Sequence, residues 1–230
     1  MNNLINSPMM GIALSLICFE IGLFIHRKTK LSILNPILIC VPLIILAMSG
    51  LHMSLDQFNK GGSLITFFLG PATVVLAVPL YKKLDLVKKY VIPIVLGVTV
   101  GCITAILSIY GFCKLLGLQD QLTFSLVPKS ITTPIGIEVS KTIGGIPAIT
   151  VSAIIITGII GAVVAPAVCK VFRIKDEVAV GISIGTASHA IGTTKAIEMG
   201  ETQGAMSGLA IGVAGLLTSF LAPLIINMLK

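Results

Sequence analysis

The stretch SIGTASHAIGTT, residues 183–194, places hydroxyl groups and a histidine inside an otherwise apolar segment. The hydroxyls donate and accept hydrogen bonds, and His189 titrates near neutral pH, so it can bind a carboxylate when protonated or carry a coupled proton. An ionisable group in such a segment is expensive to bury and points to a function. A neutral histidine hydrogen-bonded to a neighbouring carbonyl is the alternative.

A second polar interruption, FLGPATV at residues 68–74, lies 115 residues earlier, which is half the chain length. The same offset aligns apolar run 31–53 with 146–168, and run 91–113 with 206–228. Paired Gly- or Pro-interrupted spans at matching positions of two halves indicate the binding site of a transporter with inverted repeats. Identity across the offset is low, so chance similarity is the alternative.

The two interruptions supply most of the candidate substrate-binding residues. Unwound spans would present free N–H groups and half-helix N-termini to an anion. The candidates are Gly70, Pro71, Ala72 and Thr73 in the first interruption, and Gly185, Thr186, Ser188, His189, Gly192 and Thr193 in the second. Close helix packing is the alternative, because small residues also enrich transmembrane interfaces.

The segment PKSITTP, residues 128–134, sets a cation among hydroxyls between two helix-breaking prolines. If residues 122–140 re-enter the membrane, this segment forms a cationic, hydroxyl-rich gate. If they form an external loop, the lysine is a solvated charge. The candidates here are Lys129, Ser130, Thr132 and Thr133.

The composition indicates a polytopic membrane protein in a lipid bilayer. Of 230 residues, 55% are hydrophobic and 11% are charged, against about 25% charged in soluble domains. Apolar runs at 9–25, 31–53, 91–113, 148–169 and 205–229 are each long enough to cross a hydrocarbon core of about 30 Å. The net charge of +7 lies in short loops, so nucleic acid is not an expected partner.

Basic loops set the expected orientation. Positive charge clusters at residues 26–30, 82–89 and 170–175, which the positive-inside rule places in the cytoplasm. The N-terminus is then outside and the C-terminus inside, provided that 122–140 does not cross. We therefore expect one all-α integral membrane domain, 1–230, with about seven to eight spans and two discontinuous helices. Its parts are repeat one at 31–117, a re-entrant connecting segment at 118–145, and repeat two at 146–230.

Several chemistries find little support. The five cysteines are scattered without metal-ligand spacing, so we expect buried thiols and no metal. His189 has no carboxylate or cysteine at catalytic spacing, and the chain has no nucleotide-binding motif. The sequence therefore predicts neither an enzyme nor a cofactor.

Three motifs resemble the LrgB/CidB family over nearly the whole chain. They are FLGPATVVLAVPLYKK at 68–83, PKSITTP at 128–134 and GISIGTASHAIGTTKAIEMGETQGAMSGLAIGVAGLLTSFLAPL at 181–224. The family often has glycine after the motif histidine, where this chain has Ala190. The resemblance implies one of two functions. Bacterial members are described as antiholin-like regulators of murein hydrolase export and cell lysis, encoded beside a small LrgA/CidA-type membrane protein. Plastid relatives resemble glycolate/glycerate carriers, and some bacterial pairs are linked to pyruvate movement.

We therefore expect a secondary transporter of small monocarboxylates, such as pyruvate, glycolate or lactate, that works by alternating access in the bacterial cytoplasmic membrane. An antiholin-like regulator acting through an LrgA/CidA-type partner is the alternative. A homo-oligomer is left open.

Overall fold

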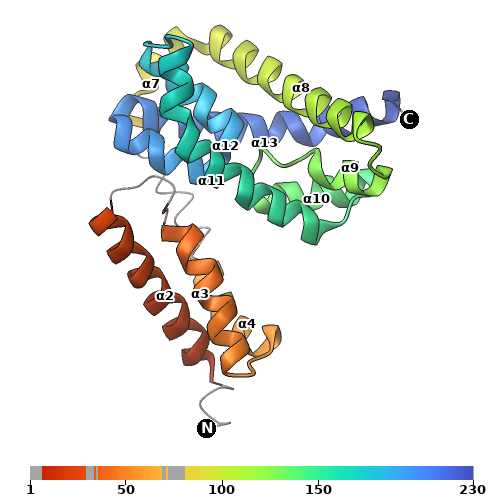
Figure 1. Cartoon of the computed structure of the whole chain (residues 1–230). Helices are drawn as coiled ribbons and strands as arrows, with labels where there is room; N and C mark the ends of the chain where they lie inside the picture. The colour runs from red at the N-terminus through yellow and green to blue at the C-terminus, as the bar shows by residue number, and fades with distance from the viewer. Residues whose placement is uncertain (1–6, 30–33, 35, 69–70, 72–80, 230) are drawn as a thin grey trace. The chain divides into compact units, whose positions relative to one another are not determined.

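The computed structural model describes residues 7–29, 34, 36–68, 71 and 81–229. Within these residues all the regular structure is α-helical. The chain forms two compact units, Met1–Val75 and Leu76–Lys230 (Figure 1). Each unit is described separately below.

The first unit packs α2 (Pro8–Thr29) against α3 (Pro36–Gly50) and α4 (Leu55–Phe67). Glycines allow this packing, because a Cβ at Gly11 would meet the Phe58 carbonyl oxygen, and one at Gly61 would meet that of Pro8. Ser54 begins α4 with a capping box: its hydroxyl accepts a hydrogen bond from the Gln57 backbone N–H, and the Gln57 side chain accepts one from the Ser54 N–H.

The second unit arranges three long helices around α12. Its helices are α7 (Leu84–Lys89), α8 (Val91–Leu115), α9 (Asp120–Leu126), α10 (Thr133–Ile143), α11 (Pro147–Val171), α12 (Glu177–Met199) and α13 (Glu201–Leu229). The α12 helix contacts α8, α11 and α13, which Figure 1 draws in yellow-green, teal and dark blue. The core of the unit forms mainly between α8 and α13, where Val98 and Ile106 pack with Met206 and Ala210.

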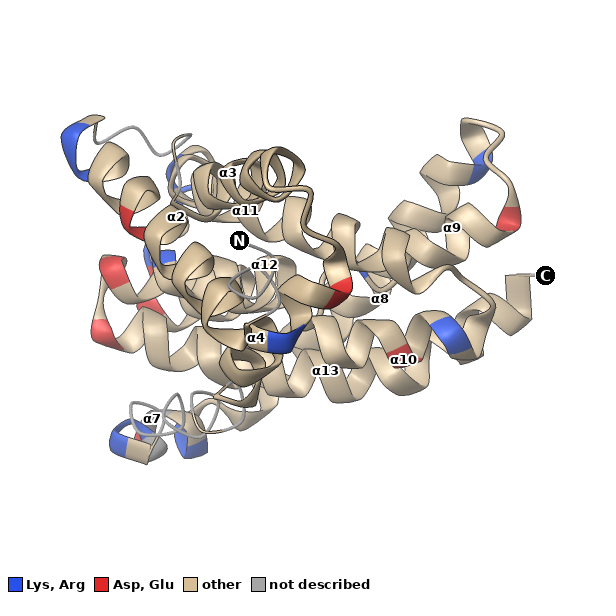
Figure 2. Ribbon diagram, turned by 90° about the horizontal axis from the view of Figure 1, so that it is seen from below, with Lys and Arg blue, Asp and Glu red and all other residues tan. Residues whose placement is uncertain are grey.

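Four of the described helices, α2, α8, α11 and α13, are long and apolar enough to cross a membrane. Together they identify an integral membrane protein. Figure 2 shows acidic and basic residues mainly towards helix ends and connections. The α12 helix is not among the four, because its polar motif lowers its hydropathy. The count of seven to eight spans, the inverted repeat and the orientation of the termini stay predictions.

The connecting segment 118–145 consists of α9, a short irregular turn and α10. Pro134 lies in the first turn of α10, where the missing N–H costs no helical hydrogen bond, and α10 ends at Gly144 with a left-handed φ of 92°. Helices of 7 and 11 residues are too short to cross a bilayer. Whether the segment re-enters the membrane stays a prediction.

Buried hydroxyls tie this segment to α11. The Thr150 hydroxyl lies 2.8 Å from the Ser125 carbonyl oxygen and 2.7 Å from the Ser140 hydroxyl. The Ser125 hydroxyl accepts a 2.7 Å hydrogen bond from the Ile146 N–H. Since Thr150, Ser125 and Ser140 are all fully buried, these bonds fix the two short helices against α11.

Glycines also set the distance between α12 and α13. A Cβ at Gly185 would meet the Ser207 carbonyl oxygen, and would lie 2.9 Å from the Ala210 Cβ. A Cβ at Gly181 would likewise meet the Gln203 carbonyl oxygen. The two helices therefore approach closely through small residues, as in other membrane helix pairs.

This packing predicts opposite effects for two alanine substitutions. Alanine favours a helix over glycine by about 1 kcal/mol, but overpacking costs about 1–3 kcal/mol. We expect Gly185→Ala to lower the free energy of unfolding, because its methyl group meets backbone. Gly212→Ala in α13 should raise it, because a Cβ there meets nothing within 4 Å. Unfolding of both variants in mixed detergent micelles measures the difference. Equal stabilities would contradict the packing described.

Candidate functional site

The polar stretch 183–194 lies in the middle of α12, and one face of it packs against neighbouring helices, while Ser183 and Thr194 are exposed. Thr186, Ser188, His189 and Thr193 are all buried. Because a polar helix is costly against lipid, its position among α8, α11 and α13 accounts for how the sequence tolerates it.

The backbone of α12 leaves the helical conformation at His189. This residue has φ 43° and ψ −141°, a region that favours glycine. Ala190 is not among the described residues with positive φ, so the lack of a glycine at position 190 introduces no such strain. The structure therefore interrupts α12 at the motif histidine itself.

The His189 ring lies at the interface of α12 and α11. Its Nε2–H donates a 2.9 Å hydrogen bond to the Ile154 carbonyl oxygen. A Cβ at Gly158 would lie 2.7 Å from the ring, so this glycine makes room for the imidazole. A carbonyl accepts the same hydrogen bond from a neutral and from a protonated imidazole, and the bond holds the ring at a defined place beside Ser188.

Three other motif residues make helix-packing contacts. Gly185 lies against α13, and Gly192 lies against Ser188 and Ile184 of its own helix. The Thr193 hydroxyl donates to the His189 carbonyl oxygen at 2.9 Å and lies 2.7 Å from the Ser207 hydroxyl. Gly185, Gly192 and Thr193 are not lining residues of either cavity described below.

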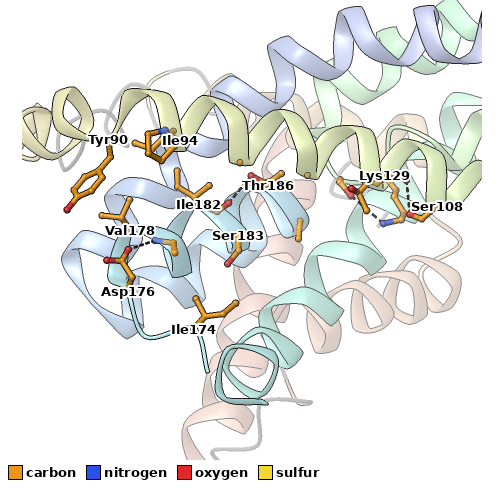
Figure 3. Close-up of a pocket in the computed structure, with 18 residues that line it drawn as sticks. Tyr90, Ile94, Ser108, Lys129, Ile174, Asp176, Val178, Ile182, Ser183 and Thr186 are labelled. Atoms are coloured by element: carbon orange, nitrogen blue, oxygen red, sulfur yellow. Dashed lines mark hydrogen bonds between the residues drawn. The ribbon is translucent and has the colours of Figure 1, made fainter. Parts of the chain in front are cut away.

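A cavity of about 820 Å³ lies between α8 and α12 (Figure 3). Lys129, Ser130 and Ser108 lie at one end of it, and Tyr90 and Asp176 at the other. The apolar side chains of Ile94 and Ile182 line the part between the two ends, and Val178 lies beside Tyr90 and Asp176. The Thr186 side chain lies between them and the Lys129 end, where its methyl group packs against Gly101.

Lys129 brings an unneutralised positive charge to this cavity. Its ammonium group donates a 3.3 Å hydrogen bond to the Ser130 hydroxyl. All nine Asp and Glu residues lie in the described part of the chain, and none of them has a carboxylate oxygen within 4.0 Å of Lys129. Such a partly buried cation at the hydroxyl-rich end of a cavity can bind an anion.

A second cavity, of about 480 Å³, lies between α11 and α12. It shares Lys129, Ser183 and Ala187 with the first and adds Thr157 and Ser188. Ser183 and Ala187 of α12 therefore lie between the two cavities, and Lys129 lines both of them.

The structure brings together some of the predicted site residues and not others. Lys129, Ser130, Thr186 and Ser188 line the two cavities. Thr132 and Thr133 begin α10 and are partly buried outside these linings. Pro71 is exposed in the first unit, and Gly70, Ala72 and Thr73 lie outside the described residues. The pairing of the two interruptions stays a prediction.

The contribution of α8 to the wall of the larger cavity was not predicted from the sequence. Gly97, Gly101, Thr104 and Ser108 line the larger cavity, and their spacing of four, three and four residues places them on one helical face. This stripe of small and hydroxyl residues in span 91–113 is the signal that would have found them.

Comparisons with known proteins match the chain almost throughout. The sequence model of the LrgB-like family matches residues 15–228. Proteins named "Antiholin-like protein LrgB" from Bacillus mycoides (strain KBAB4) and Bacillus cereus (strain B4264) are each 36% identical over 219 residues, which is 95% of both chains. No solved structure matches.

The backbone conformation at His189 predicts that glycine is more stable than alanine at this position, which is the reverse of the usual order inside a helix. Both His189→Gly and His189→Ala remove the ring, but only glycine adopts φ 43° without strain of about 1–3 kcal/mol. We expect the glycine variant to be more stable, by about 1 kcal/mol, in detergent unfolding.

Ala187, which has helical backbone in the same helix, is the matched control. There Ala187→Gly should lower the stability by about 1 kcal/mol. A His189→Ala protein as stable as His189→Gly would show that the backbone is not interrupted at this residue.

Proposed function

The chain belongs to the LrgB-like family, as its motifs predicted, and we propose that it binds a small carboxylate in the α8–α12 cavity and carries it across the membrane. The single observation that carries this proposal is Lys129, a cation without a carboxylate partner at the hydroxyl-rich end of a large cavity. In this proposal the chain is a non-enzymatic secondary transporter and needs no cofactor.

The chemistry of the Lys129 end suits a carboxylate. The ammonium group has three donors, of which one is directed to Ser130, so two remain for anion oxygens. The Ser130 and Thr104 hydroxyls line the same cavity and can add neutral donors, whereas the Ser108 hydroxyl donates to the Ala105 carbonyl oxygen at 3.2 Å. Because the surroundings are largely apolar, such charge-assisted hydrogen bonds are stronger than in water.

His189 is the candidate for proton coupling. Its ring packs beside Gly158, while the neighbouring Ser188 lines the second cavity that also meets Lys129. A proton taken up by the His189 ring would bind at Nδ1, because Nε2 already donates its hydrogen to the Ile154 carbonyl, and it would place a positive charge where α12 is interrupted. In this proposal that change alters the packing of α12 on α11 during alternating access. The two interruptions, 68–74 and 183–194, then occupy matching positions in the two halves of an inverted repeat.

The names of the relatives favour a second function, and they do so more directly than they favour transport. Both relatives are named antiholin-like, and neither name mentions a solute. In this second candidate the chain regulates murein hydrolase export and cell lysis in the cytoplasmic membrane through a small LrgA/CidA-type membrane protein. A regulator of this kind needs surfaces that pack against its partner protein. It gives no role to Lys129, a lysine without a carboxylate partner in a cavity.

Replacement of Lys129 tests the transport proposal. We expect Lys129→Gln to lower the uptake of labelled pyruvate, lactate or glycolate into proteoliposomes about 10- to 100-fold, since hydrogen bonds to charged groups contribute about 1.5–3 kcal/mol. Lys129→Arg should restore part of the uptake. Lys141→Gln, which removes an exposed charge paired with Glu138 on α10, is the matched control and should leave uptake unchanged.

A pair of assays on the same liposomes separates the two candidate functions. Saturable uptake that depends on Lys129, with or without the small partner, supports transport. The proposal fails if no saturable uptake occurs under any imposed proton or sodium gradient. Altered dye leakage through the small partner, unaffected by Lys129→Gln and without carboxylate uptake, would establish the antiholin-like function instead.

A further inference from the structure

The Ser188 hydroxyl is the exception among the five hydroxyl groups of residues 183–194. Ser188 has no hydrogen-bond partner within the described part of the chain, although the residue is only 3% exposed. A buried hydroxyl without a partner costs free energy, so it indicates a ligand that binds there. The other four hydroxyls each donate a hydrogen bond of 2.7–2.9 Å to a backbone carbonyl oxygen of α12: Ser183, Thr186, Thr193 and Thr194.

Close contacts on both sides hold this hydroxyl in a defined place. A Cβ at Gly161 of α11 would meet the Ser188 hydroxyl, and one at Gly192 would meet the Ser188 Cβ. The next residue, His189, is fixed on α11 by its bond to the Ile154 carbonyl oxygen. The Ser188 hydroxyl therefore points from α12 towards α11, where Ser188 and Gly161 line the same cavity.

Lys129 supplies a positive charge to this α11–α12 cavity. It lines the cavity together with Ser188, and it has no carboxylate partner among the described residues. Because Lys129 lines both cavities, an anion on its ammonium group can extend to the α11 side of α12 as well as to the α8 side. The α11 side therefore offers a cation for a carboxylate and a neutral hydroxyl for one further oxygen.

We infer that the Ser188 hydroxyl binds the oxygen on carbon 2 of a carboxylate whose charge is held by Lys129. Ser188 is then the residue that makes the site prefer 2-oxo and 2-hydroxy acids to acids of the same length without this oxygen. The inference rests on the proposed function and assigns the selectivity of the same site to one residue.

The chemistry of a hydroxyl suits both kinds of acid. A serine hydroxyl donates to the keto oxygen of a 2-oxo acid, and it either donates to or accepts from the hydroxyl of a 2-hydroxy acid. An acid without an oxygen on carbon 2 leaves the buried Ser188 hydroxyl unpaired, which a site discriminates against more strongly than a small change in ligand size.

Competition between pyruvate, lactate and propionate tests the inference. These acids have the same number of carbons and each carries one negative charge at neutral pH, but only propionate lacks an oxygen on carbon 2. We would measure how each displaces labelled pyruvate from the purified full chain in nanodiscs. One neutral hydrogen bond in a buried site corresponds to about 5- to 10-fold in the dissociation constant, so pyruvate and lactate should bind that much more tightly than propionate.

A matched pair of variants assigns this preference to one hydroxyl. Ser188→Ala should weaken the binding of pyruvate and lactate about 5- to 10-fold and leave that of propionate unchanged, so that the three dissociation constants become nearly equal. Thr194→Ala is the control, because it removes a hydroxyl of the same motif that already donates to the Ile191 carbonyl oxygen and lines neither cavity. It should keep the preference of the unmodified chain.

The stability of Ser188→Ala distinguishes a hydroxyl that binds a ligand from one that holds the fold together. Because the hydroxyl bonds to no described residue, its removal should not lower the free energy of unfolding in detergent without added carboxylate. A less stable Ser188→Ala protein would show that the hydroxyl has a partner in the protein and would overturn the inference.

The outcomes separate failure of the inference from failure of the proposed function. Equal Lys129-dependent binding of the three acids, or a preference that persists in Ser188→Ala, overturns the role of Ser188 and leaves the anion site. Equal weakening of all three acids in Ser188→Ala assigns the hydroxyl to the carboxylate group and also overturns its assignment to carbon 2. If no acid binds in a Lys129-dependent manner, the proposed function and the inference fail together.

Discussion

The second unit depends on covering one polar helix with three apolar ones. Hydroxyl and imidazole groups exposed to hydrocarbon would cost several kcal/mol each, so the buried polar groups of α12 depend on the packing of α8, α11 and α13 against them. The close approach is possible because glycines lie at the contacts: Gly101 on α8, Gly158 on α11 and Gly185 on α12. These glycines act first through packing, and the candidate site follows from the packing.

The position of Lys129 follows from a second set of buried polar contacts. The Thr150 hydroxyl bonds to Ser125 and Ser140 on either side of the turn that carries the lysine. Because these groups are buried and satisfied, the turn is held against α11, and the lysine meets the cavities on both sides of α12.

The sequence predicted the parts of the site that are local in the chain. The hydroxyls and the histidine in residues 183–194 and the lysine between two prolines were all visible as polar groups in apolar surroundings. The α8 wall was not predicted, because Gly97 and Thr104 resemble ordinary residues of an apolar span until the fold places α12 opposite them. The bond from His189 to Ile154 joins residues 35 positions apart, a contact that no local pattern encodes. The half-length offset between the two interruptions remains a prediction, since most of the first one lies outside the described residues.

The central claim is that an anion binds at the Lys129 end of the α8–α12 cavity. The most direct measurement is an experimental structure of the full chain with a small brominated carboxylate, located by the anomalous signal of bromine. The expected result is one bromine peak between α8 and α12, beside Lys129. A carboxylate bound elsewhere, or a cavity filled by a side chain of the protein, would contradict it.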